Sequence, residues 1–230
     1  MTAPPDAPDV AYVFFNPAEA RFVDAAVARL IPADDLGPGA KEAGVTCFID
    51  RQLAGSWGTH ARNYRVGPWR EGTPQQGYQL PLTPQEIYRA AIREINDYCS
   101  GHYGRLFCFL KEEPQNEVLR ALETGDVELA TAPSRLFFNM LLRNTMEGFF
   151  SDPIHGGNRD KIGWRLIGFP GVASASYVEE MGNAEKFNVA YRVEPVSIAD
   201  IQEKRVKVDA QGYPKHAAAQ SSAGSKHERD

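Results

Sequence analysis

The sequence lacks the cysteine and histidine patterns that hold metals or redox groups. Its three cysteines, Cys47, Cys99 and Cys108, form no Cys-x-x-Cys pair and no Cys-x-x-Cys-His haem-attachment sequence. The five histidines never lie three or four residues apart, as metal ligands on one helix would. Cys47 and Cys108 stand among apolar residues, so we expect both to be buried free thiols. The sequence argues against an attached haem, an iron–sulfur cluster and a helical metal site in this chain.

Long apolar runs and an excess of basic residues are also missing. No run approaches the roughly eighteen apolar residues that span a bilayer. The formal net charge of −5 gives no support for nucleic-acid binding. The first residues contain no twin arginine and no apolar segment of an export signal. Taken alone, that start predicts a cytoplasmic protein, but its Pro/Ala/Asp-rich composition also fits the start of a mature exported protein.

The sequence contains no recognisable catalytic motif. A glycine-rich phosphate loop following a strand is absent, and so is a Gly-x-Ser-x-Gly sequence. The remaining polar clusters are Asp34 with Asp35, and Asp152 with His155. We expect Asp34 and Asp35 to form a solvated turn and Asp152 to start another turn through its side-chain acceptor. The alternative makes these four residues the metal ligands or acid–base groups of a stand-alone enzyme.

Helical patterns cover much of the chain. Asn16-Pro17 with Glu19, and Thr83-Pro84 with Glu86, are capping sequences at the starts of two helices. Apolar residues at helical spacing predict further helices near residues 40–53, 114–123 and 134–150, with short helical pieces near 103–110, 177–181 and 196–201. We expect Met146 on the apolar face of the 134–150 helix. Convincing alternating strands are absent.

The fold class follows from these patterns. We predict a mainly α protein, a compact helical domain of five or six helices with two long ordered loops rich in glycine and aromatic residues. Residues 1–11 are expected to form a flexible leader, 12–205 the helical domain, and 206–230 a polar tail, mobile or extended.

The two loops, residues 56–82 and 150–171, are the most informative segments. They carry large aromatic and arginine side chains that a solvated linker would lack, and protein interfaces favour the same side chains. We expect Phe149, Phe150 and Phe169 to point inward. The candidate partner-interface residues are Trp57, Trp69, Arg70, Tyr78, Asp152, His155, Asn158, Arg159 and Trp164.

Several segments occur in one consistent order between about residues 12 and 200. They are FFNPAE at 14–19, LIPADDLGPGA at 30–40, FID at 48–50, LTP at 82–84, EGFF at 147–150, DPIHGGNRD at 152–160, and GW followed by GFPG within 163–171. Together they resemble the small third subunit of the gluconate 2-dehydrogenase family.

The resemblance implies a helical accessory subunit without an active site or cofactor of its own. Its partner would be a large FAD-containing subunit of the glucose–methanol–choline type, often joined by a multihaem cytochrome c subunit. The complex would be periplasmic, so this chain would meet the membrane only indirectly. In this family the small subunit commonly carries a twin-arginine export signal and helps its folded partner mature. This sequence departs from that pattern because it contains no twin arginine. The alternatives are the stand-alone metal-dependent enzyme and a transient cytoplasmic chaperone.

Overall fold

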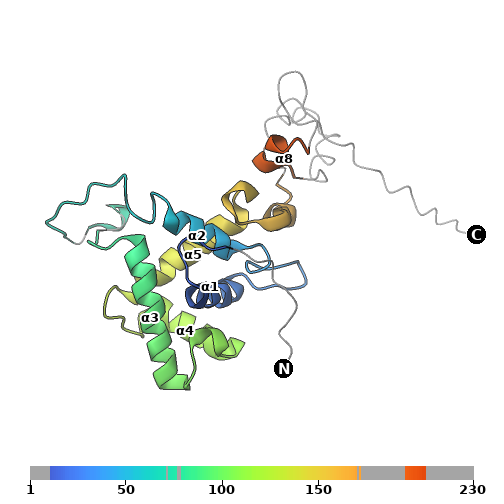
Figure 1. The fold of residues 1–230 in the computed structure, drawn as a ribbon. Helices are drawn as coiled ribbons and strands as arrows, with labels where there is room; N and C mark the ends of the chain where they lie inside the picture. The colour runs from blue at the N-terminus through green and yellow to red at the C-terminus, as the bar shows by residue number, and fades with distance from the viewer. Residues whose placement is uncertain (1–10, 71, 77–78, 170, 172–194, 206–230) are drawn as a thin grey trace, which may run out of the picture.

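Helices dominate the part of the chain that the computed structural model describes, residues 11–70, 72–76, 79–169, 171 and 195–205 (Figure 1). Seven are α-helices: α1 (Pro17–Leu30), α2 (Val45–Ala54), α3 (Pro84–Tyr103), α4 (Glu112–Thr124), α5 (Ser134–Phe150), α6 (Ile162–Ile167) and α8 (Ile198–Gln202). Four are 3-10 helices: η1 (Pro74–Gln76), η2 (Phe107–Phe109), η3 (Pro153–His155) and η4 (Arg159–Lys161). These residues contain no strand, and no helix among them is long and apolar enough to cross a membrane. The mainly α prediction is confirmed.

Helices α1 and α3 begin where their capping sequences predicted. The Asn16 side chain accepts hydrogen bonds from the backbone N–H groups of Ala18 and Glu19, and Glu19 accepts one from the Asn16 N–H in return. Thr83 and Glu86 form the same reciprocal pair at the start of α3. Each arrangement satisfies N–H groups that a helix start otherwise leaves without partners.

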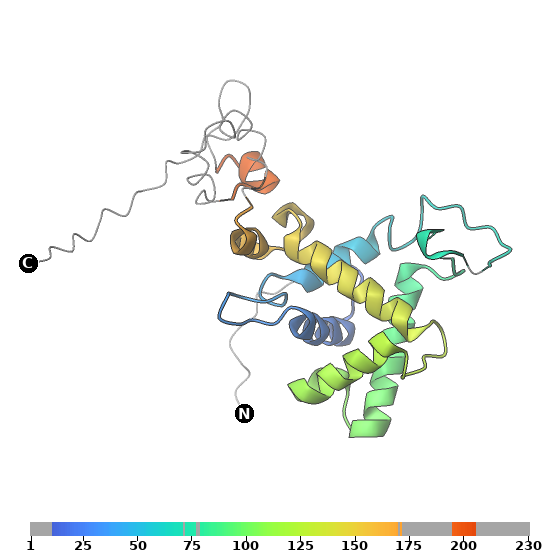
Figure 2. The ribbon, with the colours of Figure 1, turned by 180° about the vertical axis from the view of Figure 1, so that it is seen from behind.

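Helix α5 is the central element of the helical body and contacts α1, α2, α3, α4 and α6 (Figures 1 and 2). Its Phe137 meets the ring of Tyr88 on α3 edge-on, with ring centroids 5.3 Å apart, and both side chains are fully buried. The Tyr88 hydroxyl accepts a hydrogen bond from Asn144 of α5 at 3.1 Å. Burying one such ring stabilises the fold by about 1.5–3 kcal/mol, so this contact fixes α3 against α5.

Some details differ from the sequence-based predictions. Helix α2 begins at Val45 rather than near residue 40, because residues 40–44 form a turn that ends with Gly44 in a left-handed conformation. Met146 was predicted on the buried face of α5 but is exposed, because it lies on the side of α5 away from the core. The helical turn predicted at 177–181 lies outside the described residues, as do the predicted tail and all but the last residue of the leader.

The three cysteines are free thiols. Cys99 is buried in α3, and burial raises the pKa of its thiol to about 11. Cys47 and Cys108 are only half-buried, contrary to expectation. Cys108 lies in the single turn of η2, which buries Phe107 but leaves Phe109 largely exposed, so one turn cannot bury three successive side chains.

Candidate functional site

The predicted interface residues fall into two groups that the fold keeps apart. Trp57, Trp69 and Arg70 lie between α2 and α3, and Tyr78 of the same segment lies outside the described residues. The other five lie between the end of α5 and the end of α6. Figures 1 and 2 show these two segments at opposite sides of the helical body. The two groups therefore do not form one continuous surface.

The second segment is a folded unit on the end of α5 rather than a loop. It contains η3, η4 and α6, which the sequence did not predict because six residues are too few to show helical periodicity. Its glycines permit backbone-to-backbone contact. A Cβ on Gly157 would lie 2.2 Å from the Gly148 carbonyl oxygen, and one on Gly163 would lie 2.1 Å from that of Phe149. A larger residue at either position would push the segment away from α5.

Asn158 connects the two sides of this unit. Its side chain is fully buried; the amide nitrogen donates to the Ser151 carbonyl and the amide oxygen accepts from the Gly163 N–H, both at 2.8 Å. Its backbone has φ of +47°, a region that asparagine tolerates better than most residues. The neighbouring Arg159 N–H donates to the Ala43 carbonyl at 2.8 Å, which ties the unit to the turn before α2.

Trp164 also faces inward. It is only 5 % exposed, and its indole N–H donates to the Phe150 carbonyl at 2.8 Å. Trp164 and Asn158 therefore act within the chain, whereas Arg159 and His155 are exposed. The inward prediction is confirmed for Phe149 but wrong for Phe169, which is 39 % exposed. Helix α6 ends before Phe169, whose ring meets Trp164 edge-on and keeps its other side toward solvent.

Asp152 is a structural acceptor in this arrangement. One carboxylate oxygen accepts from the Ile154 N–H at 3.0 Å and caps η3, as its turn-starting role predicted. The other accepts from the Ile198 N–H at 2.8 Å and holds the start of α8. Both oxygens thus bind backbone groups of the chain itself, and His155 makes no part of these contacts.

Helix α8 is attached to the same unit by a second carboxylate. Asp200 accepts from the Ser197 hydroxyl at 2.8 Å and from the Lys161 ammonium at 3.1 Å. Burial by itself would raise the pKa of Asp200, but the hydrogen bonds from Ser197 and the Lys161 charge outweigh it and lower the pKa below the ordinary aspartate value. The large apolar side chains of Leu166, Ile167 and Ile198 on α6 and α8 are exposed.

The first segment returns to its starting point and is anchored at both ends. Trp57 and Leu82 pack against the core. The Gln85 N–H donates to the Gly58 carbonyl at 3.2 Å, and the Gln85 side chain donates to the Leu53 carbonyl at 2.7 Å. The ends of the segment are thus held side by side, and the part between them projects beyond the start of α3 (Figure 1).

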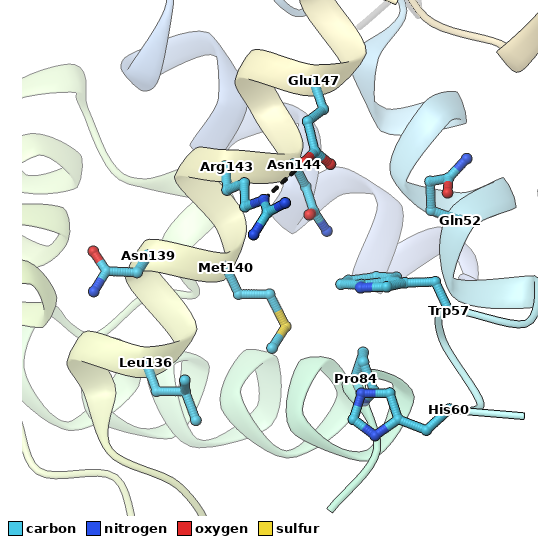
Figure 3. Close-up of a pocket in the computed structure, with 10 residues that line it drawn as sticks. All are labelled: Gln52, Trp57, His60, Pro84, Leu136, Asn139, Met140, Arg143, Asn144 and Glu147. Atoms are coloured by element: carbon cyan, nitrogen blue, oxygen red, sulfur yellow. Dashed lines mark hydrogen bonds and ion pairs between the residues drawn. The ribbon is translucent and has the colours of Figure 1, made fainter. Parts of the chain in front are cut away.

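A groove lies at the base of this segment (Figure 3). Its volume is about 370 Å³, and Figure 3 shows Trp57 and Met140 pointing toward each other across it. His60 lies at one end and the Arg143–Glu147 ion pair at the other. Burial, with a smaller contribution from the Arg65 charge, lowers the pKa of His60 below the ordinary histidine value.

Two of the four residues of the stand-alone enzyme alternative, Asp34 and Asp152, have local structural roles. Asp34 accepts from the Leu36 N–H at 2.8 Å and exchanges backbone hydrogen bonds with Gly37, so it shapes the turn that the sequence predicted. Asp35 is exposed in the same turn. Within the described part of the chain, no group of three or more His, Cys, Asp or Glu side chains could hold a metal ion.

The sequence did not reveal a polar cluster between α1 and α2. The buried Asp50 carboxylate accepts the backbone N–H groups of residues 13–15 at distances between 2.7 and 2.9 Å. Asp24 accepts from the Thr46 hydroxyl, and burial raises the pKa of Asp24. Burial and nearby carboxylates raise the pKa of Tyr12 to about 12. The sequence signal that could have revealed this cluster is Asp50, an acidic residue among the apolar residues of α2. The cluster fixes the chain before α1.

Comparison with known proteins identifies the family. The family described as Gluconate 2-dehydrogenase subunit 3 matches residues 17–171, from the first residue of α1 to Gly171, four residues after the end of α6, and both segments lie inside this range. No curated protein and no solved structure matches the chain. The family match covers more than half of the sequence. This chain therefore belongs to the gluconate 2-dehydrogenase subunit 3 family, whose members are subunits of multi-subunit dehydrogenase complexes.

Proposed function

We propose that this chain is a non-catalytic accessory subunit that binds and stabilises the large FAD-containing subunit of a sugar or polyol dehydrogenase of the glucose–methanol–choline type. The family match over residues 17–171 carries the proposal, because it spans the helical body and both anchored segments. In this proposal the flavin and the sugar pocket belong to the large subunit. A multihaem cytochrome c subunit would complete the complex and receive the electrons.

The surface chemistry supports a binding role. Tyr64 and Val66 are 86 % and 68 % exposed in the first segment, and Ile167 is 57 % exposed in the second. Large apolar side chains are unfavourable in water. When a partner covers them, the complex is stabilised by about 25 cal/mol per Å² of apolar surface buried. Aromatic side chains beside arginines are also typical of the residues that dominate binding energy at interfaces.

The proposal includes maturation, export and location. A subunit that binds the folded flavoprotein and not its unfolded chain stabilises the folded form by mass action. Binding before export would let the pair cross the membrane together. The assembled complex would then work in the periplasm and contact the membrane through its other subunits.

Purification from the native source tests the proposal. We expect an affinity-tagged chain to recover a large flavoprotein in equal molar amount, seen as flavin absorbance that elutes with the complex. A partner that is released after assembly would favour the transient chaperone. Turnover with a bound metal by the chain alone would favour the stand-alone enzyme. Either result would overturn the proposal.

A further inference from the structure

The first segment differs in charge from the rest of the chain. Residues 56–82 carry three arginines and a single acidic residue, Glu71, in a protein whose formal net charge is −5. All three arginines fall within residues 61–70, which contain no acidic residue. Opposite charge on two surfaces speeds their encounter and selects the partner. A local positive charge on an acidic protein therefore favours an acidic binding surface.

Residues 61–70, which we call the arginine–aromatic loop, interleave these charges with apolar side chains. Arg62 and Arg70 are exposed, and so are Tyr64, Val66 and Trp69. None of these five side chains is part of the hydrophobic core. Tyr, Trp and Arg are the residue types enriched among the strongest contributors to interfaces. The loop thus offers both charge and apolar area on the same ten residues.

The loop is held in shape from within. Arg65 is half-buried, and its guanidinium donates to the Pro81 carbonyl on the returning part of the segment. The Trp69 ring lies against Gly67, where an added Cβ would be 3.3 Å from the ring. The base is fixed by Trp57, Leu82 and the Gln85 hydrogen bonds described above. A pre-organised loop loses less conformational entropy on binding than a free one.

We propose that the arginine–aromatic loop docks this chain onto an acidic surface of its dehydrogenase subunit, where an apolar depression receives Tyr64 and Trp69. This inference rests on the proposed function and names the surface through which it acts. Arg62 and Arg70 form the charged rim of the contact, Tyr64 and Trp69 its apolar centre, and Arg65 is a positioning residue.

Charge reversal within the complex tests the assignment. Wild-type chain, the double variant Arg62→Glu/Arg70→Glu and the variant Trp69→Ala are each titrated against the flavoprotein recovered with the wild-type chain. The matched control is Arg21→Glu/Arg105→Glu, which makes the same charge change at exposed positions outside the loop. Thermal melting of each free variant verifies its fold, and Arg62→Lys/Arg70→Lys tests charge separately from guanidinium geometry.

We expect the Arg62→Glu/Arg70→Glu variant to bind at least about tenfold more weakly, with most of the loss in the association rate. Wild-type affinity should fall as salt rises from about 50 to about 500 mM, and this dependence should be much smaller in the double variant. Trp69→Ala should weaken binding by about tenfold through faster dissociation. The control should stay within about twofold of wild type, and the lysine variant should keep the salt dependence.

Two results would overturn the inference, and they are distinguishable from a failure of the proposed function. Loop variants that bind like wild type, or a control that loses as much affinity as the loop variants, would show that the contact lies elsewhere while the complex still forms. A wild-type chain that recovers no flavoprotein would overturn the proposed function, and the loop assignment with it.

Discussion

Single side chains determine the shape of the unit at the end of α5. Asn158 and Trp164 each donate a side-chain hydrogen bond to a backbone carbonyl earlier in the chain, that of Ser151 and that of Phe150 respectively. A buried polar group left without its partner costs about 1–3 kcal/mol, which exceeds the net value of the bond itself. Both residues were predicted at the partner interface from their chemistry alone. Their burial shows that tryptophan and asparagine in a glycine-rich segment can serve the chain's own packing.

Replacing Trp164 tests this structural role. We expect Trp164→Ala to lower the free energy of unfolding by about 3–5 kcal/mol, because it removes a buried indole and leaves a cavity. At about 2–4 °C per kcal/mol, the melting temperature should fall by on the order of 10 °C. Trp164→Phe should lower the free energy of unfolding by about 1 kcal/mol beyond the loss caused by its smaller side chain, because the Phe150 carbonyl loses its hydrogen-bond donor. The readout is thermal melting of the purified chain.

The exposed Trp69 provides the control for that measurement. Trp69→Ala removes the same side-chain type from a position that is 39 % exposed and outside the core, so melting should change by less than about 2 °C. Equal effects of Trp69→Ala and Trp164→Ala would contradict the difference in burial between the two positions.

At the scale of elements, the capped starts of α1 and α3 were predictable from the sequence, whereas η3, η4 and α6 were not. The capping boxes at Asn16 and Thr83 are local, so four consecutive residues carry the whole signal. Helix α6 depends instead on its contacts with α5, because a six-residue helix is unstable alone. Helix α8 is shorter still and matches the helical piece predicted near residues 196–201. A hydrogen bond to Asp152 and the Lys161–Asp200 ion pair attach it to the rest of the chain.

The attachment of α8 should depend on pH through Asp200. The folded structure lowers the pKa of this carboxyl, so its ionised form stabilises the attachment above the ordinary aspartate pKa of about 3.9. That contribution is lost as pH falls through the lowered pKa of the folded state. We expect α8 amides to exchange hydrogen more slowly in wild type than in Asp200→Asn at pH 7, with the difference shrinking below about pH 4. Hydrogen exchange followed by mass spectrometry measures it.

Glu203→Gln is the matched control on the same part of the chain. Glu203 is exposed, and the one ion pair that the structure describes for it is with the exposed Arg205. Removing the Glu203 charge should therefore change the hydrogen exchange of the α8 amides little at any pH. The α8 amides of wild type and Asp200→Asn could also differ in exchange rate by the same factor at pH 3 and at pH 7. That result would show that ionisation of Asp200 does not hold α8.

At the scale of the whole molecule, the helical body separates two surfaces. The arginine–aromatic loop projects beyond the start of α3, while α6 and α8 lie at the other side (Figures 1 and 2). Helix α5 joins these regions and contacts the other large helices. In the proposed function, one surface would cover the flavoprotein subunit and the other would stay open to a further subunit.

Binding should raise the stability of the whole chain. With the flavoprotein subunit at about 100 times its dissociation constant, mass action adds about 2.7 kcal/mol to the unfolding free energy of this chain. At about 2–4 °C per kcal/mol, its melting temperature should rise by about 5–11 °C. Pulse proteolysis across a temperature series can follow this chain by its size on a gel. An unrelated flavoprotein at the same concentration is the control; an equal rise with it would contradict specific binding.

The sequence by itself determined the capped starts of α1 and α3, the mainly α class and the family, because caps, periodicity and ordered motifs are encoded in neighbouring residues. Only the tertiary structure decided which aromatic residues face inward. Trp164 and Phe169 stand five residues apart in one glycine-rich segment, yet one is buried against Phe150 and the other is exposed. That outcome depends on backbone contacts between Gly157, Gly163 and the end of α5, which join residues distant in sequence. Burial is a property of such long-range contacts, and local patterns do not record them.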